Sequence, residues 1–196
     1  MRIRTIRGWF ECRLAIWFVG GALTLAPSTL QAQSNPPKEY QIKAAFLLNF
    51  AQFVDWPAAV FTNAEAPLTI GVVGDDPFGA ALEKTVEGET VHNRRLTIQR
   101  SRTIENVKDC HLIFIAKSEE GRVGDILSRV RTQPALTVGE VRGFARLGGV
   151  INFYLEGNKV RFEINPIAAR ENGLKISSQL LRLGRIVEAA PPKEAK

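Results

Sequence analysis

Apolar positions along the chain fall either into short runs or into segments with helical spacing. Residues 40–55 contain no glycine or proline, and several polar side chains gather on one stripe, which predicts a buried helix ended by Trp56 and Pro57. Residues 122–131 carry an apolar face at helical spacing and predict a second helix. Strands are predicted for the runs at residues 68–74, 95–100, 112–116 and 135–138.

A β-hairpin is predicted beyond Gly149. Residues 150–155 and 159–164 flank Gly157-Asn158, a dipeptide suited to a tight turn. Apolar and polar side chains alternate in the second run, so the hairpin is expected to have one apolar and one polar face.

Two further helices are expected after the hairpin. The first begins at Asn165-Pro166 and ends at Gly173, and the second runs from Ser177 to about residue 187. Strands alternating with helices indicate one α/β domain, with a mixed, largely parallel sheet flanked by helices and with a C-terminal β-hairpin and helices. The expected parts are a signal peptide at residues 1–32, a linker at 33–38, the domain at 39–188 and a frayed tail at 189–196.

The first 32 residues have the order of an export signal. A basic start precedes an apolar run at residues 14–26, and small or polar residues lead to Ala32, after which we expect cleavage. This run is too short to cross a bilayer, which takes about 20 residues. We therefore expect a soluble protein outside the cytoplasm, the alternative being that an uncleaved signal anchors the chain.

Charge argues against a nucleic-acid partner. Removing residues 1–32 lowers the formal net charge from +6 to +3, with 22 basic and 19 acidic residues left. The remaining cluster of basic residues has no aromatic interleaving, which favours a solvated sheet edge over a nucleic-acid platform. Its members are Arg94, Arg95, Arg100 and Arg102.

No residue pattern indicates catalysis, a metal or a cofactor. His92 and His111 are the two histidines, and neither lies in a motif with a nucleophile or at the spacing of metal ligands. Cys12 leaves with the signal, so Cys110 is expected either as a buried free thiol or in an intermolecular bridge.

Asp75 and Asp76 follow a strand that contains glycine, which makes them candidates for an anion or small-ligand site. The alternative is that they are cap and turn residues, with Asp76 at the N-cap and Pro77 at the first helical position. Lys43 falls on the apolar side of the first predicted helix, so its ammonium must either reach solvent or meet a carboxylate. Lys43 and Trp56 are therefore given structural roles.

Several stretches together resemble the YfiR family of periplasmic proteins, in the same order along nearly the whole mature chain. The resemblance implies an α/β homodimer that binds the periplasmic domain of an inner-membrane diguanylate cyclase and represses it, which lowers cyclic di-GMP and biofilm formation. It also implies release by an OmpA-like outer-membrane lipoprotein. The stretches are residues 40–50, 54–57, 71–78, 110–114, 143–145, 148–153, 161–165 and 176–183.

Two positions depart from the better-known members of that family. Gly71 stands where they often carry a cysteine, and no cysteine flanks Gly148. These departures weaken the case for disulfide control of folding or activity.

We expect the partner to contact the loop that contains Phe144 and Arg146, the polar hairpin face at Glu163, and Arg170. Two alternatives stay open: Phe144 belongs to the core, and Glu163 is solvated or paired with Lys43. A small-ligand sensor that acts on another membrane signalling protein is the alternative function, and an enzyme is the least supported class.

Overall fold

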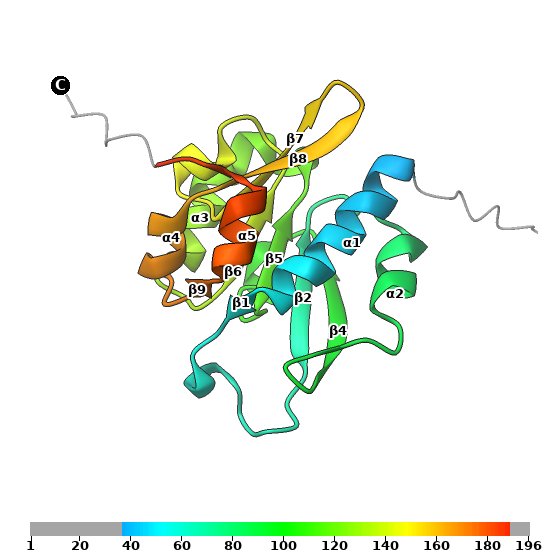
Figure 1. Cartoon of the computed structure of the whole chain (residues 1–196), viewed down its shortest axis with the longest axis vertical. Coiled ribbons are helices and arrows are strands. Elements are labelled where there is room, and N and C mark those ends of the chain that lie inside the picture. Colours follow the sequence, from blue (N-terminus) through cyan, green and yellow to red (C-terminus); the bar gives the residue numbers. More distant parts are fainter. Residues whose placement is uncertain (1–36, 189–196) are drawn as a thin grey trace, which may run out of the picture. The chain divides into compact units, whose positions relative to one another are not determined.

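The structure is a computed structural model that describes residues 37–188 (Figure 1). The expected signal peptide, most of the linker and the tail lie outside the described residues. Eight strands form one sheet in the order β10-β8-β7-β6-β5-β2-β4-β3. The strands are β2 (Leu68–Val73), β3 (Thr90–Val91), β4 (Arg94–Ser101), β5 (Leu112–Ile115), β6 (Leu136–Gly139), β7 (Ile151–Glu156), β8 (Lys159–Ile164) and β10 (Arg185–Ile186).

Parallel pairing dominates the sheet. Strands β4, β2, β5, β6 and β7 pair in parallel, whereas β7 and β8 form an antiparallel hairpin and β3 pairs antiparallel with β4. Every residue of β5 and β6 is buried, as expected for parallel strands covered on both faces. The predicted α/β class with a mixed, largely parallel sheet is confirmed.

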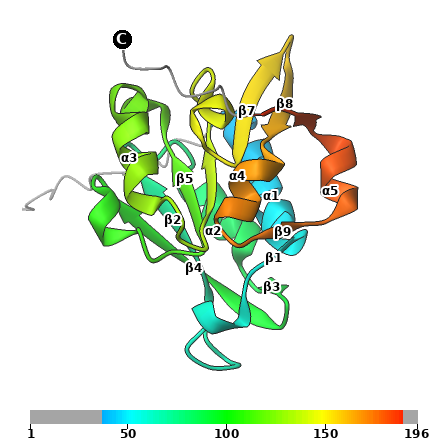
Figure 2. The same ribbon diagram turned by 90° about the vertical axis from the view of Figure 1, so that its left-hand side faces the viewer.

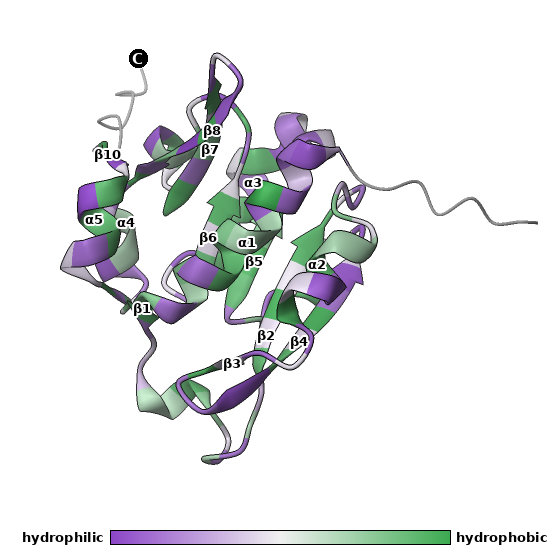
Figure 3. Cartoon of the chain, turned by 45° about the vertical axis from the view of Figure 1, so that its right-hand side comes forward, coloured by the Kyte–Doolittle hydropathy of each residue, from purple (hydrophilic) through white to green (hydrophobic). Residues whose placement is uncertain are grey.

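Helices cover both faces of the sheet. Helices α1 (Lys38–Gln52) and α2 (Ala80–Val86) lie on one face, and α3 (Val123–Val130) lies on the other (Figure 2). Helices α4 (Pro166–Glu171) and α5 (Ser178–Leu183) follow the hairpin. The hydropathy colouring shows apolar strands between these helices (Figure 3).

Helix α1 is fastened to the hairpin by aromatic rings. Phe46 lies 5.5 Å from Phe162 and 6.0 Å from Phe153, measured between ring centroids. Phe50 lies 5.0 Å from Phe162. Such close aromatic pairs add to the free energy of apolar burial, and they fix the hairpin's apolar face against α1.

Short elements complete the fold. A two-stranded antiparallel sheet pairs β1 (Val54–Asp55) with β9 (Lys175–Ile176), and it was not predicted because each strand has only two residues. The 3₁₀ helices are η1 (Ala58–Val60), η2 (Ile104–Asn106), η3 (Lys117–Arg122) and η4 (Phe144–Leu147).

The structure corrects three helix boundaries. Helix α1 ends at Gln52 and does not reach Asp55, because Val54 and Asp55 form strand β1. Helix α2 begins at Ala80 with Gly79 at its N-cap, so Asp76 is not the cap; Asp76 Oδ1 instead accepts a hydrogen bond from the Phe78 amide in a local turn. Helix α5 ends at Leu183 and does not reach residue 187, because the chain enters strand β10. A Cβ at Gly184 would come within 2.7 Å of the Ile164 side chain, so this close approach requires glycine.

No helix between residues 37 and 188 is both long enough and apolar enough to cross a membrane.

Candidate protein-binding surface

The polar face of the β7–β8 hairpin carries Glu163, one of the predicted partner residues. Strand register places Asn152 opposite Glu163 and Tyr154 opposite Arg161 on this face. In Figure 1 the hairpin projects beyond the helices at one end of the sheet. Its apolar face is covered by α1 near the body, but Leu155 near the tip stays 52% exposed. The hairpin therefore offers polar and apolar groups to a partner.

Glu163 is a buried carboxylate held in a fixed position. It is only 6% exposed, and its two oxygens are bound separately. Oε1 accepts a hydrogen bond from Arg185, and Oε2 accepts one from Asn152 Nδ2 at 3.2 Å. The hydrogen bond with Glu163 raises the pKa of the Arg185 guanidinium. The alternative left open by the sequence, that Glu163 is solvated or paired with Lys43, is therefore wrong, because the carboxylate is buried and its cation is Arg185.

Arg185 joins this buried pair to the surface. Its side chain is 58% exposed, and its guanidinium carbon lies 4.6 Å from the centre of the Tyr154 ring. A cation above an aromatic face is attracted by the ring quadrupole, so Tyr154 helps to fix the position of Arg185.

Asn152 leaves one hydrogen-bond acceptor unused. Its Oδ1 is the single buried side-chain nitrogen or oxygen between residues 37 and 188 that has no hydrogen-bond partner. Buried polar atoms are ordinarily satisfied, so this oxygen marks a place where a donor is missing. Sequence reasoning did not identify Asn152 or Arg185, because Arg185 fell inside a predicted helix and Asn152 has no distinctive motif of its own.

Phe144 anchors the neighbouring loop and is not part of the surface. The ring is fully buried and rests against Gly139 and Gly149, where added Cβ atoms would come within 2.5 and 2.1 Å of it. The structure therefore removes Phe144 from the expected contact residues and places it in the core, the alternative left open by the sequence. Ala145 is buried as well, whereas the two residues after it, Arg146 and Leu147, are exposed.

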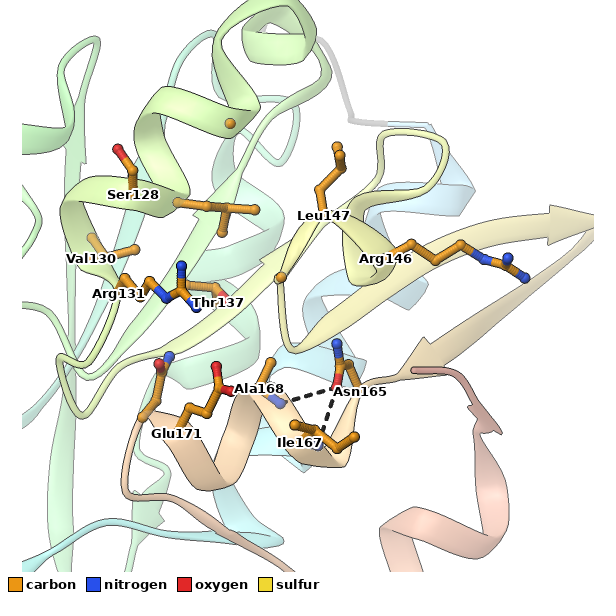
Figure 4. A pocket seen from close by; sticks show the side chains of 14 residues that line it. Ser128, Val130, Arg131, Thr137, Arg146, Leu147, Asn165, Ile167, Ala168 and Glu171 are labelled. Atoms are coloured by element: carbon orange, nitrogen blue, oxygen red, sulfur yellow. Dashed lines mark hydrogen bonds between the residues drawn. The ribbon is translucent and has the colours of Figure 1, made fainter. Parts of the chain in front are cut away.

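A cavity of about 450 Å³ lies between α3, η4 and α4 (Figure 4). Asn165 joins two of its walls: Oδ1 accepts hydrogen bonds from the amides of Ile167 and Ala168, and Nδ2 donates to the Ala145 carbonyl. Figure 4 shows Arg146 extending away from this cavity. Arg170 lies exposed on α4 and is not among the residues that line the cavity.

Lys43 belongs to a separate buried cluster. It is 3% exposed, and its ammonium lies 2.6 Å from Glu140 Oε2 and also contacts Glu39. The Tyr40 hydroxyl donates to Glu140 Oε1 at 3.3 Å, and burial followed by the charge of Glu140 raises the pKa of Tyr40. Lys43 thus meets a carboxylate, as one of the two sequence alternatives stated.

Asp75 and Asp76 lie where β2 ends, beside the loop that follows β5. Asp75 is paired with Arg102 at 3.1 Å, and Asp76 with Arg100 at 2.7 Å. The Asp75 amide donates to Ser118 Oγ at 2.9 Å. Parallel sheets often bind ligands at the carboxyl ends of two neighbouring strands where the strand order reverses, as it does between β2 and β5. Here, however, both carboxylates are paired with arginines. Their role as a ligand site stays a prediction.

Of the remaining candidates, Cys110, His111 and Trp56 lie close together, and His92 lies near Asp55. Cys110 is a buried free thiol whose pKa burial raises to about 11. Trp56 Nε1 donates to the His111 carbonyl at 3.0 Å, which is a structural contact. The His92 side chain is exposed. Within residues 37–188, no three His, Cys, Asp or Glu side chains are grouped to hold a metal.

Comparison with known proteins gives one family. A sequence description of the YfiR/HmsC-like family matches residues 40–185. No curated protein matches the chain.

Comparison with solved structures agrees with the fold. A conserved domain protein from Vibrio cholerae O1 biovar El Tor superposes with a TM-score of 0.52 and 11% sequence identity, covering 77% of this chain. The chain spans 60% of that protein's length. An ABC domain from Streptococcus pneumoniae in complex with L-Trp gives a TM-score of 0.42 and 12% identity, covering 61% of this chain and 55% of its own.

Proposed function

Because the chain belongs to the YfiR/HmsC-like family, a regulatory and non-catalytic family, we propose that it represses a membrane diguanylate cyclase from the periplasm. In this proposal it binds the enzyme's periplasmic sensory domain and so lowers cyclic di-GMP and biofilm formation. An OmpA-like outer-membrane lipoprotein relieves repression by sequestering the repressor, which acts as a homodimer.

One observation carries the choice of surface: the buried Glu163 carboxylate is fixed between Arg185 and Asn152, while Asn152 Oδ1 lacks a donor. Both groups are buried, so they act through Arg185, whose side chain is 58% exposed and is held in place by Glu163 and the Tyr154 ring. A cation positioned in this way binds a partner at low entropic cost, because its geometry is already set in the free protein. Leu155 at the hairpin tip and Leu147 in the η4 loop, 52% and 59% exposed, add apolar area near these polar groups.

Repression needs no chemistry by this chain. The repressor must bind the inactive conformation of the cyclase more tightly than the active one. A shift from 99:1 to 1:99 requires a preference of about 5.5 kcal/mol. One standard interface, which buries about 1,600 Å², supplies enough contacts for this preference.

The test measures binding of the full chain to the periplasmic domain of a candidate cyclase by biolayer interferometry. We expect Arg146→Glu and Glu163→Gln to weaken binding at least tenfold, or about 1.4 kcal/mol, and Glu65→Gln, on the exposed segment before β2, to leave it unchanged. Glu163→Gln keeps the shape of the side chain and removes its charge, so circular dichroism should show a folded variant. Full affinity in both Arg146→Glu and Glu163→Gln would reject this surface as the binding site.

The cavity between α3, η4 and α4 supports a second candidate function, a small-ligand sensor. Its volume is within the range of small-molecule sites. A thermal-shift screen decides between the two, since a ligand at a hundred times its dissociation constant stabilises the fold by about 2.7 kcal/mol. Tight, saturable stabilisation by one compound, without binding to a cyclase domain, would favour the sensor.

A further inference from the structure

Residues 57–66, called here the edge segment, cross the end of the sheet at which the parallel strands β2 and β5 begin. Arg94 of β4 holds the far part of this segment, since Nη1 donates hydrogen bonds to the carbonyls of Asn63 at 2.9 Å and Ala66 at 2.7 Å. His111, directly before β5, holds the near part through Phe61 and Val60.

The His111 contacts consist of one ring stack and two hydrogen bonds. The Phe61 ring lies parallel to the imidazole, with centroids 4.5 Å apart and an angle of 12° between the planes. The Arg94 guanidinium carbon is 3.7 Å from the centre of the same phenyl ring. A hydrogen bond also joins the imidazole to the main chain of Val60.

The second hydrogen bond fixes the tautomer of His111. Nδ1 accepts from the Thr69 amide at 3.1 Å, so the single proton of the neutral ring is on Nε2. Thr69 belongs to β2, which pairs with β4 on one side and β5 on the other. The Thr69 amide is therefore held in place and cannot turn away from the imidazole.

A second proton on His111 conflicts with this arrangement. It can enter only at Nδ1, where it would face the hydrogen of the Thr69 amide. The imidazolium would also approach the Arg94 cation across Phe61. Burial, followed by the charge of Arg94, lowers the pKa of His111, and the hydrogen bond to Val60 acts in the opposite direction; the net lowering agrees with this geometry.

Other charged groups near the imidazole are few. The loop before β5 contributes Lys108 and Asp109, which line a cavity of about 590 Å³ together with His111. The other walls, at residues 57–60 and 133–135, carry no titratable side chain. This cavity gives the charged ring space to move away from Thr69.

We propose that protonation of His111 breaks its hydrogen bond with the Thr69 amide and so loosens the edge segment from the sheet, which makes this end of the domain a pH-sensitive latch. The neutral imidazole ties the edge segment to β2 through Thr69, whereas the imidazolium keeps its hydrogen bond to Val60 and moves away from Thr69 together with the segment. The inference is independent of the proposed repressor function, because it concerns a different end of the sheet.

The test is a pH titration of the full ¹⁵N-labelled chain from pH 8 to pH 4.5, followed by NMR. We expect the amides of Val60, Phe61 and Thr69 to shift with the same midpoint as the His111 ring, below the ordinary histidine value of 6.5. The rate of hydrogen exchange at residues 57–66, corrected for the intrinsic rate, should rise about tenfold for each unit by which the pH falls from 6.5 to the His111 midpoint.

Two variants give the comparison. In His111→Asn, the side-chain oxygen replaces Nδ1 as acceptor for Thr69 and cannot be protonated, so the transition should disappear. In His92→Asn, which removes the exposed histidine, the transition should persist. A transition that persists in His111→Asn would overturn the proposal. So would amides of the edge segment whose shifts do not change when His111 titrates in the wild type, and this second result does not depend on any variant being folded.

Discussion

The Phe144 ring lies so close to Gly149 that an added Cβ at Gly149 would stand 2.1 Å from Cε1 of that ring. The opposite contact, with Gly139, is nearly as close, and the loop around Phe144 is bounded by Gly143 and Gly148, both with positive φ. These glycines therefore explain how a bulky side chain is buried in a short loop. They also fix where the exposed Arg146 stands.

We expect Gly149→Ala to lower the free energy of unfolding by about 1–3 kcal/mol or more, because the methyl group must displace the Phe144 ring. Gly124→Ala is the matched control, since nothing lies within 4 Å of its added Cβ in helix α3. This control should gain up to about 1 kcal/mol from helix propensity. Urea unfolding measures both, and equal effects would contradict the packing argument.

Lys43→Met should destabilise the domain by about 3–5 kcal/mol, because it leaves the Glu140 carboxylate buried without its cation. The double variant Lys43→Met with Glu140→Met should recover much of this loss, since no buried charge is left unpaired. Chemical denaturation of the two variants and of the wild type gives the comparison. A double variant less stable than Lys43→Met would contradict this argument and would show that Glu140 stabilises the domain through its contacts with Tyr40 and the Lys117 amide.

Gly71→Cys should form a disulfide with Cys110 under oxidising conditions. A Cβ at Gly71 would lie 3.1 Å from the Cys110 Cβ, slightly less than the 3.5–4.5 Å that is usual across a disulfide, so only a small shift of the strand is needed. Mass spectrometry with and without reductant detects the bond in a Cys12→Ser background. A variant that keeps two free thiols after oxidation would contradict this geometry.

Cys110 should make alkaline conditions destabilising. Burial raises its pKa from 9.0 to about 11, so the folded state favours the neutral thiol. Its contribution to stability is complete below pH 9 and is lost as the pH rises toward 11. Urea unfolding of the wild type and of Cys110→Ala at pH 8 and pH 10.5 isolates this effect. The difference between the two proteins should shrink at the higher pH.

Local sequence predicted most of the sheet because the pattern of each strand can be recognised without knowing the rest of the fold. Leu112–Ile115 is continuous apolar sequence, and the Gly157-Asn158 turn defines the hairpin register without help from the rest of the fold. The buried position of Lys43 also followed from its place on the apolar side of α1.

Contacts between distant segments could not be foreseen in the same way. Lys43 meets Glu140 because α1 crosses the end of β6, and no periodicity relates those two residues. Arg185 reaches Glu163 only because the chain leaves α5 at Gly184 and joins β8 as strand β10. The position of Arg185 on the candidate surface thus depends on strand β10, which has two residues and is too short to be recognised from a sequence pattern.

Helix α1 comes first among the described elements, yet its aromatic residues pack on strands β7 and β8, more than a hundred positions later. During synthesis the Phe46 and Phe50 rings therefore lack their partners on the hairpin until residues 151–164 have been made. Closing so long a loop is entropically costly, so contacts of this kind slow folding. The domain is accordingly one whose core closes only after nearly the whole polypeptide has been released.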